Sequence, residues 1–341
     1  MSQKILIADS EHAPACDELQ GYLDGYELIC PATNDDFSGL LSADVVGLIA
    51  QDQKIESAVL KKLPNLELAL SLGRNHSNFD TEAVKNQGIK FATVWRKGPN
   101  CVAELAITLI LSMSKDLLVS HDSVANGAYR YRGLQPIQSE QWKMAFHWMK
   151  NENVHEVHGK RLGIVGLGEI GYELAIRASV MGMGVSYYKR TRLPEDLEQV
   201  VPLEFMGLND MLASSDYICL AVPHTPKTEK MIGASEFEIM KNDAILINIC
   251  RGGVVDENAM VNALLQGQIK GAGLDVFDYE PLPTDSPLAT LHNVILTPHI
   301  GGGTGTTRTG EIKMSIDEFS CIIGGSSPRW PAKVESLISG Y

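Results

Sequence analysis

The chain has 341 residues, 44% of them hydrophobic and 21% charged, so its length favours two domains and its composition argues against disorder. Its formal net charge of −13 argues against non-specific binding to nucleic acid or to an anionic membrane, because both need a cationic surface. No apolar run approaches the roughly eighteen residues of a membrane span, and the N-terminus lacks a signal-peptide pattern, so we expect a cytoplasmic protein.

Short apolar runs and helical patterns alternate along the first hundred residues. The runs Lys4–Ala8, Val45–Ala50 and Leu66–Leu72 are mostly aliphatic, whereas Ser57–Leu63 has helical spacing. This alternation is typical of a small β/α domain with a parallel sheet. Ligands of open α/β sheets bind beyond the carboxyl ends of the strands, which draws attention to the polar loop Gly73–Asp80.

The longest apolar helical pattern runs from Cys101 to Val119. Apolar residues surround much of it, so we expect it to be buried between domains or in a subunit interface. The segment Gly127–Glu156 then brings many aromatic and charged residues without a clean period. It is interpreted either as a surface arm that packs on a partner subunit or as an aromatic lid over the active site.

The sequence from Arg161 to Tyr188 predicts a β-α-β unit. An apolar run, Arg161–Val165, precedes the glycine-rich turn GLGEIG at 166–171, and Tyr172–Met181 has helical spacing. A second apolar run, Gly184–Tyr188, closes the unit. A lone GxGxxG is weak evidence, but a strand before it and a helix and strand after it favour a dinucleotide site. Methyltransferase loops and tight turns without a ligand are the alternatives.

Each glycine of the turn has a separate expected role. Gly166 allows the tight turn, Gly168 lets the backbone approach a pyrophosphate, and Gly171 lets the helix pack closely on the sheet. Free amides at the helix start then face the phosphate charge, and Glu169 and Ile170 of the turn are also expected to bind the cofactor.

The end of the second strand predicts the choice between NAD(H) and NADP(H). A fold that selects NAD usually has an acidic residue there, about twenty residues into the unit, which binds the ribose 2′-hydroxyl. This chain has Lys189, Arg190, Thr191 and Arg192, and the next carboxylate is Glu195. We therefore expect NADP(H) to be preferred over NAD(H). The alternative is that this strand end only carries solvated basic residues.

The later part of the chain predicts a doubly wound sheet from about 160 to 298. Four further strands are expected, at Tyr217–Val222, Ala244–Asn248, Gly271–Val276 and Val294–Thr297. The last helical pattern, Thr306–Gly324, is expected to return to the short N-terminal domain. The predicted domains are therefore a discontinuous substrate domain, 1–101 with 311–341, and a nucleotide-binding domain, 102–310.

Six cysteines are scattered without a CxxC pair, at Cys16, Cys30, Cys101, Cys219, Cys250 and Cys321. They are interpreted as small hydrophobic residues in a reducing compartment, and they predict neither a metal site nor a disulfide framework.

Three ionisable residues follow successive predicted strands of the second domain: Arg251, Glu280 and His299. Strand ends on one edge of a parallel sheet converge, so the three side chains are expected to meet beside the cofactor. This set suits hydride transfer at a carbon that carries a hydroxyl. Histidine supplies a base of near-neutral pKa, a carboxylate can fix its tautomer, and a guanidinium can hold a carboxylate or polarise a carbonyl oxygen.

Each of the three also has a structural interpretation. His299 can be a hydrogen-bonded core histidine, Glu280 a solvated turn residue and Arg251 a surface cation at a helix start. As a triple on one sheet edge beside a dinucleotide site, they favour catalysis.

The motifs together resemble those of the D-isomer-specific 2-hydroxyacid dehydrogenase family. They are GLGEIG at 166–171, ILINICRGGVVDE at 245–257, GAGLDVFDYEPLP at 271–283 and LTPHIGG at 296–302, with looser matches in GRNHSNFD at 73–80 and VAELAITLIL at 102–111. The resemblance implies two Rossmann-like parallel-sheet domains, one flavodoxin-like and one doubly wound, with a cleft between them. It also implies NAD(P)-dependent interconversion of a D-2-hydroxy acid and a 2-oxo acid, and a homodimer.

The resemblance also implies the roles of individual residues. His299 becomes the acid/base, Glu280 its partner, and Arg251 the group that binds the substrate carboxylate and the reacting oxygen. Asp275 would hold the nicotinamide carboxamide, and Pro223 would also contact the cofactor. The substrate carboxylate would be bound by the backbone around Leu72, Gly73 and Arg74.

The first loop departs from the family pattern. Members usually have glycine, aspartate and asparagine where this chain has Asn75, Ser77 and Asn78. Arg74, with the CRG triplet at 250–252, is similar to phosphite dehydrogenases, so oxidation of a small oxyanion is an alternative activity. Some members of the fold are dinucleotide-sensing corepressors, and a binding protein of that type is the alternative from a different class.

Overall fold

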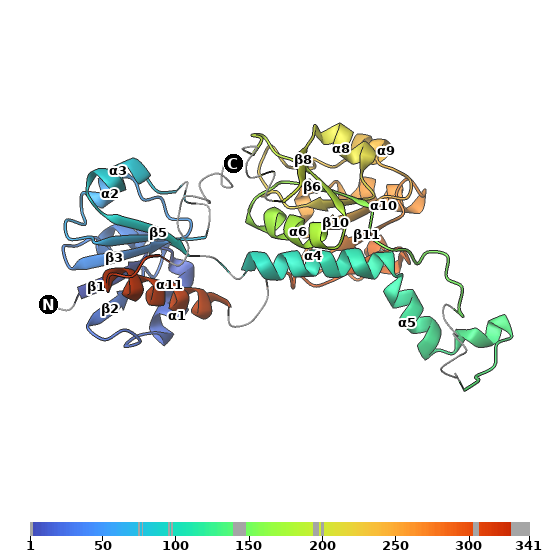
Figure 1. Ribbon diagram of the computed structural model, residues 1–341, viewed down its shortest axis with the longest axis horizontal. Coiled ribbons are helices and arrows are strands. Elements are labelled where there is room, and N and C mark those ends of the chain that lie inside the picture. The colour runs from blue at the N-terminus through green and yellow to red at the C-terminus, as the bar shows by residue number, and fades with distance from the viewer. Residues whose placement is uncertain are drawn as a thin grey trace. The chain divides into compact units, whose positions relative to one another are not determined.

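The computed structural model describes residues 3–73, 76, 78–94, 96, 98–138, 148–193, 198, 201–302 and 307–328. The chain forms two compact units (Figure 1). The first unit comprises Met1–Cys101, Arg190–Pro194 and Gly302–Tyr341, and the second comprises Val102–Lys189 and Glu195–Gly301. The predicted fold class of two parallel-sheet α/β domains is confirmed. The domain boundaries given above stay a prediction.

The first unit is built on a five-stranded parallel sheet of order β2-β1-β3-β4-β5. Its strands are β1 (Gln3–Ile7), β2 (Tyr26–Ile29), β3 (Val45–Ala50), β4 (Leu68–Leu72) and β5 (Lys90–Val94). Its helices are η1 (Ser10–His12), α1 (Ala13–Glu18), η2 (Asn34–Leu40), α2 (Ser57–Leu60), α3 (Thr81–Asn86) and α11 (Thr307–Ile323). One apolar cluster joins α1 and α11 to the sheet, and a second cluster lies on the other face with η2, α2 and α3. The unit therefore has three layers.

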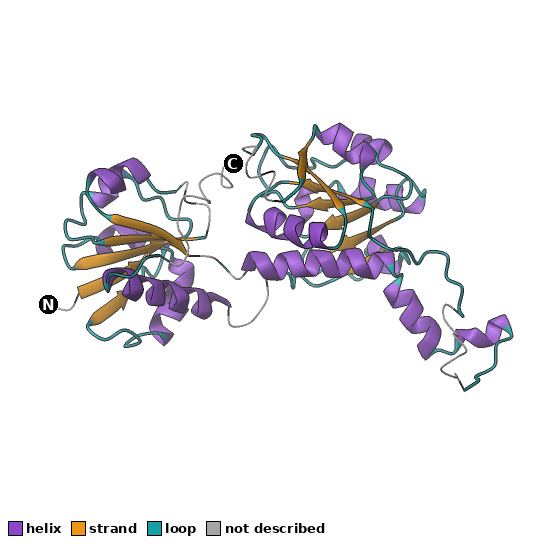
Figure 2. Ribbon diagram, viewed as in Figure 1, coloured by secondary structure: helices purple, strands orange, loops and turns teal. Residues whose placement is uncertain are grey.

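The second unit is built on a seven-stranded parallel sheet of order β12-β11-β10-β9-β6-β7-β8 (Figure 2). Its strands are β6 (Arg161–Val165), β7 (Gly184–Tyr188), β8 (Leu203–Phe205), β9 (Tyr217–Leu220), β10 (Ile245–Asn248), β11 (Gly271–Leu274) and β12 (Val294–Leu296). Its helices are α4 (Gly98–Ser114), which begins in the first unit, α5 (Leu117–Ala125), η3 (Ala128–Arg132), α6 (Glu169–Val180), α8 (Leu208–Ser214), α9 (Ala234–Ile239), η4 (Gly252–Val254), α10 (Glu257–Leu265) and η5 (Pro287–Thr290).

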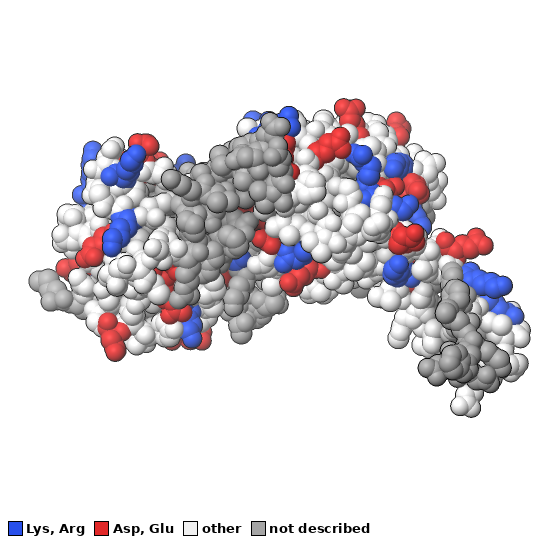
Figure 3. Space-filling model, viewed as in Figure 1, with Lys and Arg blue, Asp and Glu red and all other residues white. Residues whose placement is uncertain are grey.

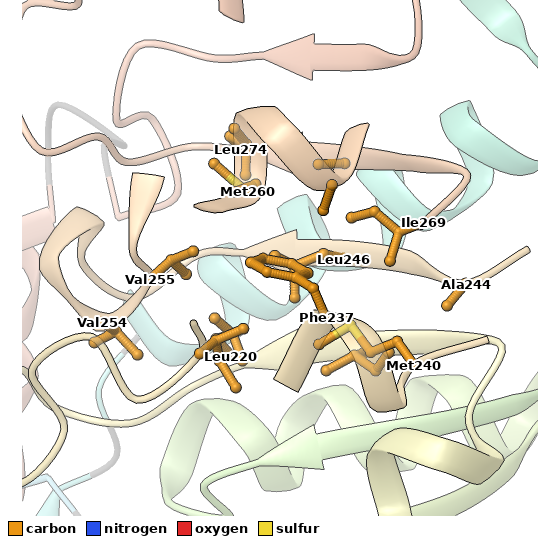
Figure 4. Packing of buried hydrophobic residues seen from close by; sticks show 14 of the residues in the cluster. Leu220, Phe237, Met240, Ala244, Leu246, Val254, Val255, Met260, Ile269 and Leu274 are labelled. Atoms are coloured by element: carbon orange, nitrogen blue, oxygen red, sulfur yellow. The ribbon is translucent and has the colours of Figure 1, made fainter. Parts of the chain in front are cut away.

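A large apolar cluster lies on the face of this sheet that α8, α9 and α10 cover (Figure 4). Phe237 from α9 is 1% exposed and packs among residues of the central strands, including Leu220 and Leu246. Burial of such a side chain is worth about 1.5–3 kcal/mol. Central strands such as β10 are buried along their whole length, as expected when helices cover both faces of a parallel sheet.

The long helix predicted from Cys101 to Val119 is interrupted. α4 ends at Ser114, and α5 begins at Leu117 after Asp116, which has a left-handed φ of 47°. Aspartate tolerates this conformation better than most residues, and its carboxylate accepts a hydrogen bond of 2.7 Å from the amide of Asn151. α4 contributes buried residues, whereas α5 contributes none. The expectation of burial therefore applies only to the first part of the pattern.

The visible surface of the second unit carries acidic and basic side chains interspersed with one another (Figure 3). Among the described residues, no helix is long and apolar enough to cross a membrane.

Candidate active site

The three ionisable residues predicted to act together follow three neighbouring strands. β10, β11 and β12 lie side by side in the sheet. Arg251 follows β10, Glu280 follows β11 and His299 follows β12, so all three lie at the carboxyl edge. This is the edge at which open α/β sheets bind ligands.

The structure brings His299 and Glu280 into direct contact. Nδ1 of His299 lies 2.6 Å from Oε2 of Glu280, and the other carboxylate oxygen accepts a hydrogen bond of 3.2 Å from the amide of Phe277. The His299 side chain is 43% exposed, so the ring remains open to a ligand. The contact fixes one ring nitrogen against the carboxylate and leaves Nε2 as the nitrogen that can exchange a proton with a substrate.

The electrostatics of Glu280 favour the charged form. Partial burial alone would raise the pKa of its carboxyl, but hydrogen bonds from His299 and Phe277, with the nearby charge of Arg251, hold the pKa below its ordinary value. A carboxylate that stays ionised can stabilise a positive charge on the imidazole ring.

His299 has an unusual backbone. Its φ of 54° lies in the left-handed region, which a residue with a side chain rarely adopts. Its amide donates to the carbonyl oxygens of Asp275 and Thr297, both at 3.0 Å. The backbone conformation of His299 is therefore held by hydrogen bonds, one of them to the end of the neighbouring strand.

Asp275, which directly follows β11, is 1% exposed. Its carboxylate accepts hydrogen bonds from the hydroxyl of Thr297 at 2.6 Å and from the amides of Ile300 and Gly301 at 2.9 Å each. Both carboxylate oxygens thus bind the loop that carries His299. Its predicted contact with the nicotinamide carboxamide stays a prediction.

Two hydrogen bonds shape the turn that contains Arg251. Its Nη1 donates to the carbonyl of Cys250 at 2.6 Å, and its own carbonyl accepts from the side-chain amide of Asn248 at 3.1 Å. A Cβ added to Gly252 would lie 2.0 Å from the backbone of Phe277. Only glycine therefore allows the Arg251 turn to pack against the segment that leads to Glu280.

The glycine-rich turn has the crowding that the sequence predicts. Gly166 has a φ of 97°, and a Cβ there would lie 2.6 Å from the side chain of Val222. A Cβ at Gly171 would lie 2.3 Å from the carbonyl oxygen of Gly166. α6 begins at Glu169, three residues earlier than predicted, with Gly168 as its extended N-cap and Ile170 in its first turn. The first amides of α6 therefore face the turn, which fits a phosphate group.

The basic residues after β7 differ in exposure. Lys189 is 5% exposed, and this burial lowers the pKa of its ammonium group. Arg190, Thr191 and Arg192 are exposed. The solvent-accessible side chains of this group are thus the two arginines and the threonine. No carboxylate of the described residues follows β7 before Glu198, whose Oε1 accepts from the hydroxyl of Tyr187 at 2.5 Å.

The substrate loop of the first unit is partly described. Leu72 is buried at the end of β4, and the amide of Gly73 donates to the carbonyl of Val94 at 2.8 Å. Arg74, Asn75 and Ser77 lie outside the described residues. The predicted contacts of this loop with the substrate stay predictions.

A second histidine–carboxylate pair follows β9 and was not predicted. His224 contacts Glu229 through Nε2, directly after Pro223, and its ring packs on Gly253. The sequence signal was a histidine five residues before a glutamate at a strand end, which is too common to single out. Among the described residues, no group of three or more histidine, cysteine or acidic side chains could hold a metal ion.

The model of the D-isomer-specific 2-hydroxyacid dehydrogenase NAD-binding domain matches residues 108–301, more than half of the chain. The chain belongs to the D-isomer-specific 2-hydroxyacid dehydrogenase family. This dehydrogenase is 35% identical over 285 residues to glyoxylate/hydroxypyruvate reductase B of Enterobacter sp. (strain 638), with 83% of each chain covered. It is 36% identical over 286 residues to the glyoxylate reductase of Thermococcus gammatolerans, with 84% of this chain and 82% of the relative covered.

A solved structure extends the similarity to the whole fold. The NADPH-dependent glyoxylate/hydroxypyruvate reductase of Sinorhizobium meliloti, in complex with NADP and malonate, matches with a TM-score of 0.57 at 25% identity. The match covers 99% of this dehydrogenase and 98% of that chain. The predicted activity class, NAD(P)-dependent interconversion of 2-hydroxy and 2-oxo acids by hydride transfer, is confirmed, and the phosphite and corepressor alternatives are not favoured.

Proposed function

We propose that this dehydrogenase reduces small 2-oxo acids of the glyoxylate and hydroxypyruvate type, with His299 as acid/base. The observation that carries the proposal is the 2.6 Å contact between His299 and the ionised Glu280 at the edge that also presents Arg251. The named relatives, which are glyoxylate and hydroxypyruvate reductases, support this substrate class.

The proposed reaction uses each of the three residues once. A nicotinamide cofactor, with its pyrophosphate at the glycine-rich turn 166–171, would supply the hydride that reduces the carbonyl carbon of the 2-oxo acid. His299 donates the proton from Nε2 to the carbonyl oxygen as that oxygen becomes an alkoxide, so the product is the 2-hydroxy acid. Glu280 stabilises the imidazolium before transfer, and Arg251 holds the substrate carboxylate and the reacting oxygen together.

A substrate panel tests this proposal. Rates of NADPH and NADH oxidation would be measured with glyoxylate, hydroxypyruvate, pyruvate and larger 2-oxo acids, and the reverse reaction with the matching D- and L-hydroxy acids and phosphite. We expect the highest catalytic efficiency with glyoxylate and hydroxypyruvate and, in the reverse reaction, turnover of only the D-isomer of each chiral hydroxy acid. Tight cofactor binding without turnover of any of these compounds would overturn the proposal.

We also propose that NADP(H) is preferred over NAD(H). The support is that no described carboxylate lies between β7 and Glu198, that Arg190 and Arg192 are exposed, and that the Sinorhizobium relative was solved with NADP. Because Lys189 is buried, the two arginines are the expected partners of the ribose 2′-phosphate.

Kinetics with both cofactors decide the preference. Arg190→Ala and Arg192→Ala should raise the Michaelis constant for NADPH and leave that for NADH almost unchanged. A wild-type catalytic efficiency with NADH equal to or above that with NADPH would contradict the preference.

We infer that the enzyme is a homodimer. The expected interface is formed by α5 and by the arm Gly127–Glu156 that follows it. α5 has no buried residue, and α5 and the arm together expose large apolar side chains at Leu117, Leu118, Val119, Val124, Tyr131, Leu134, Ile137 and Trp148. Exposed apolar surface of this extent usually marks an interface. Light scattering should give twice the chain mass for the wild type, and Leu118→Asp should lower the measured mass. A monomeric wild type would favour the lid interpretation.

The cytoplasmic location stays a prediction.

A further inference from the structure

Two of the proposed catalytic groups lie in turns at the carboxyl edge of the second unit's sheet, on either side of β11. The turn after β10 carries Arg251, and the loop after β12 carries His299. Each is organised by one buried polar side chain that has no atom in the proposed chemistry of the 2-oxo group. These side chains are Asn248, 1% exposed, and Asp275, also 1% exposed.

Asn248 is the last residue of β10, and its side chain folds back over the turn. Its Oδ1 accepts from the amide of Cys250 at 3.2 Å and from the thiol of Cys250 at 3.1 Å. Its Nδ2 donates to the carbonyl of Arg251 at 3.1 Å. One amide group thus bonds to the backbone on both sides of the peptide link that leads into Arg251, and this sets the direction in which the guanidinium leaves the turn.

Asp275 does the same for the loop after β12. Its carboxylate binds Thr297, Ile300 and Gly301, which lie on both sides of His299, and its carbonyl accepts the amide of His299 itself. A left-handed φ at a residue with a side chain persists only where the surroundings impose it. Here the four hydrogen bonds to Asp275 hold His299 in its left-handed conformation.

The backbones of the two positioning residues are joined to each other. The amide of Asp275 donates to the carbonyl of Asn248 at 3.0 Å, which continues the ladder between β10 and β11. Gly252 packs on the backbone of Phe277, so the Arg251 turn also touches the segment that carries Glu280. The backbone segments that carry the three proposed catalytic groups are therefore connected by hydrogen bonds and by close packing.

We propose that Asn248 and Asp275 are positioning residues, Asn248 for the guanidinium of Arg251 and Asp275 for the imidazole of His299. The inference rests on the proposed roles of Arg251 and His299 and adds the groups that hold them. Misplacement of a reacting group by about 1 Å can cost about a hundredfold in rate. Loss of either positioning residue should therefore affect catalysis far more than it affects cofactor binding.

The two residues should give different kinetic signatures. Asn248→Ala frees the Arg251 turn, so the Michaelis constant for the 2-oxo acid should rise about ten- to a hundredfold while the cofactor dissociation constant is unchanged. Asn248→Asp keeps the acceptor for Cys250 and loses the donor to Arg251, and should fall between wild type and Asn248→Ala. Asn293→Ala is the matched control, because it removes a similar amide-to-carbonyl bond, to Lys270, at the opposite edge of the sheet.

Asp275→Asn places an amide donor against at least one of the donors that the carboxylate now binds, and should lower kcat about a hundredfold. Thr297→Val removes only the hydroxyl donor and is the milder variant, should Asp275→Asn fold poorly. Asp216→Asn is the control, since that carboxylate binds the amide of Arg161 at the opposite edge, at 2.7 Å.

A second readout does not depend on turnover. The groups that act on Glu280 are His299, the Phe277 amide and Arg251, and the first of these helps to hold its pKa down. If Asp275 positions His299, Asp275→Asn and Thr297→Val should raise the pKa of Glu280 in a carbon-13 NMR titration, whereas Asp216→Asn should leave it unchanged. A purely structural role would lower thermal stability without moving this titration.

The outcomes separate the two proposals. A wild type that reduces no 2-oxo acid removes the proposed function, but the Glu280 titration still decides whether Asp275 holds His299 in place. Loss of cofactor affinity in Asp275→Asn with an unchanged Glu280 titration would overturn the positioning role of Asp275 and assign it to the cofactor. Control variants with the same kinetic losses as Asn248→Ala would overturn that of Asn248.

Discussion

Asp9 in the first unit and Asp275 in the second make the same kind of hydrogen bonds, but the loops that they hold differ in function. Asp9 follows β1, is 6% exposed, and accepts the amides of Gln51, Asp52 and Gln53 at 2.6, 2.9 and 2.7 Å. Asp275 follows β11 and accepts two amides and a hydroxyl from the loop after β12. In both units a buried carboxylate at one strand end fixes the loop of the adjacent strand.

The difference lies in what each loop carries. The loop that Asp9 holds contains none of the three proposed catalytic groups, whereas the loop that Asp275 holds contains His299 in a left-handed conformation. Carboxylate-to-amide contacts are thus a general way to order a strand end, and they serve catalysis only where a reactive side chain is attached. Stability and activity should separate at Asp9 and coincide at Asp275.

Removal of the imidazole proposed as acid/base from the second loop should have the largest effect. His299→Ala should lower turnover by about two to four powers of ten, the range typical of general acid/base catalysis. Cofactor affinity, measured by fluorescence titration, should stay nearly intact. Loss of that affinity would mean that His299 has a structural role.

Arg251→Lys tests the turn after β10, whose backbone is bound by the side chain of Asn248. A planar guanidinium can bind a carboxylate and a carbonyl oxygen together, and an ammonium group cannot. Loss of one charge-assisted hydrogen bond corresponds to about a ten- to hundredfold rise in the Michaelis constant for the 2-oxo acid. Steady-state kinetics close to wild type would show that charge alone is sufficient.

Glu280→Gln should be milder and should appear in the pH profile. Because the pKa of Glu280 lies below its ordinary value of about 4.3, the carboxylate persists at neutral pH, and its contribution is lost only as the pH falls through the lowered pKa. In the glutamine variant the imidazolium has no neighbouring charge, so the pH optimum of reduction should shift downwards. An unchanged profile would remove Glu280 from the mechanism.

Asp9→Asn should have the smallest effect on catalysis. Its loop loses acceptors for buried amides, so the free energy of unfolding should fall by about 1–3 kcal/mol in urea denaturation. Turnover at a temperature where the variant is folded should equal that of wild type, with the exposed Asp24→Asn as control. A loss of kcat as large as that of Asp275→Asn would contradict the distinction between the two loops.

The sequence predicted the buried strands well but missed three of the four strands at the sheet edges, β2, β5 and β8. β3 and β10 appear as continuous apolar runs because helices cover both of their faces, whereas β2, β5 and β8 lie at or near sheet edges or are only three residues long. The break between α4 and α5 was missed because it depends on a contact between Asp116 and the distant Asn151.

The meeting of His299 and Glu280 could be predicted, because the carboxyl ends of parallel strands converge whatever the loops do. The positioning role of Asn248 could not, since a polar residue at the end of an apolar run is the ordinary end of a strand. Its partners Cys250 and Arg251 are neighbours in sequence, but the turn that brings their backbone groups onto one amide is visible only in three dimensions.

The positive φ of His299 has a consequence for how this enzyme can be made more heat-tolerant. Left-handed backbone costs a residue with a side chain about 1–2 kcal/mol, and glycine is free of that cost. His299→Gly should therefore unfold at a higher temperature than His299→Ala. A library sorted only for survival at high temperature would favour glycine at this position and would discard the imidazole, so thermal selection of this enzyme must be coupled to a screen for reduction.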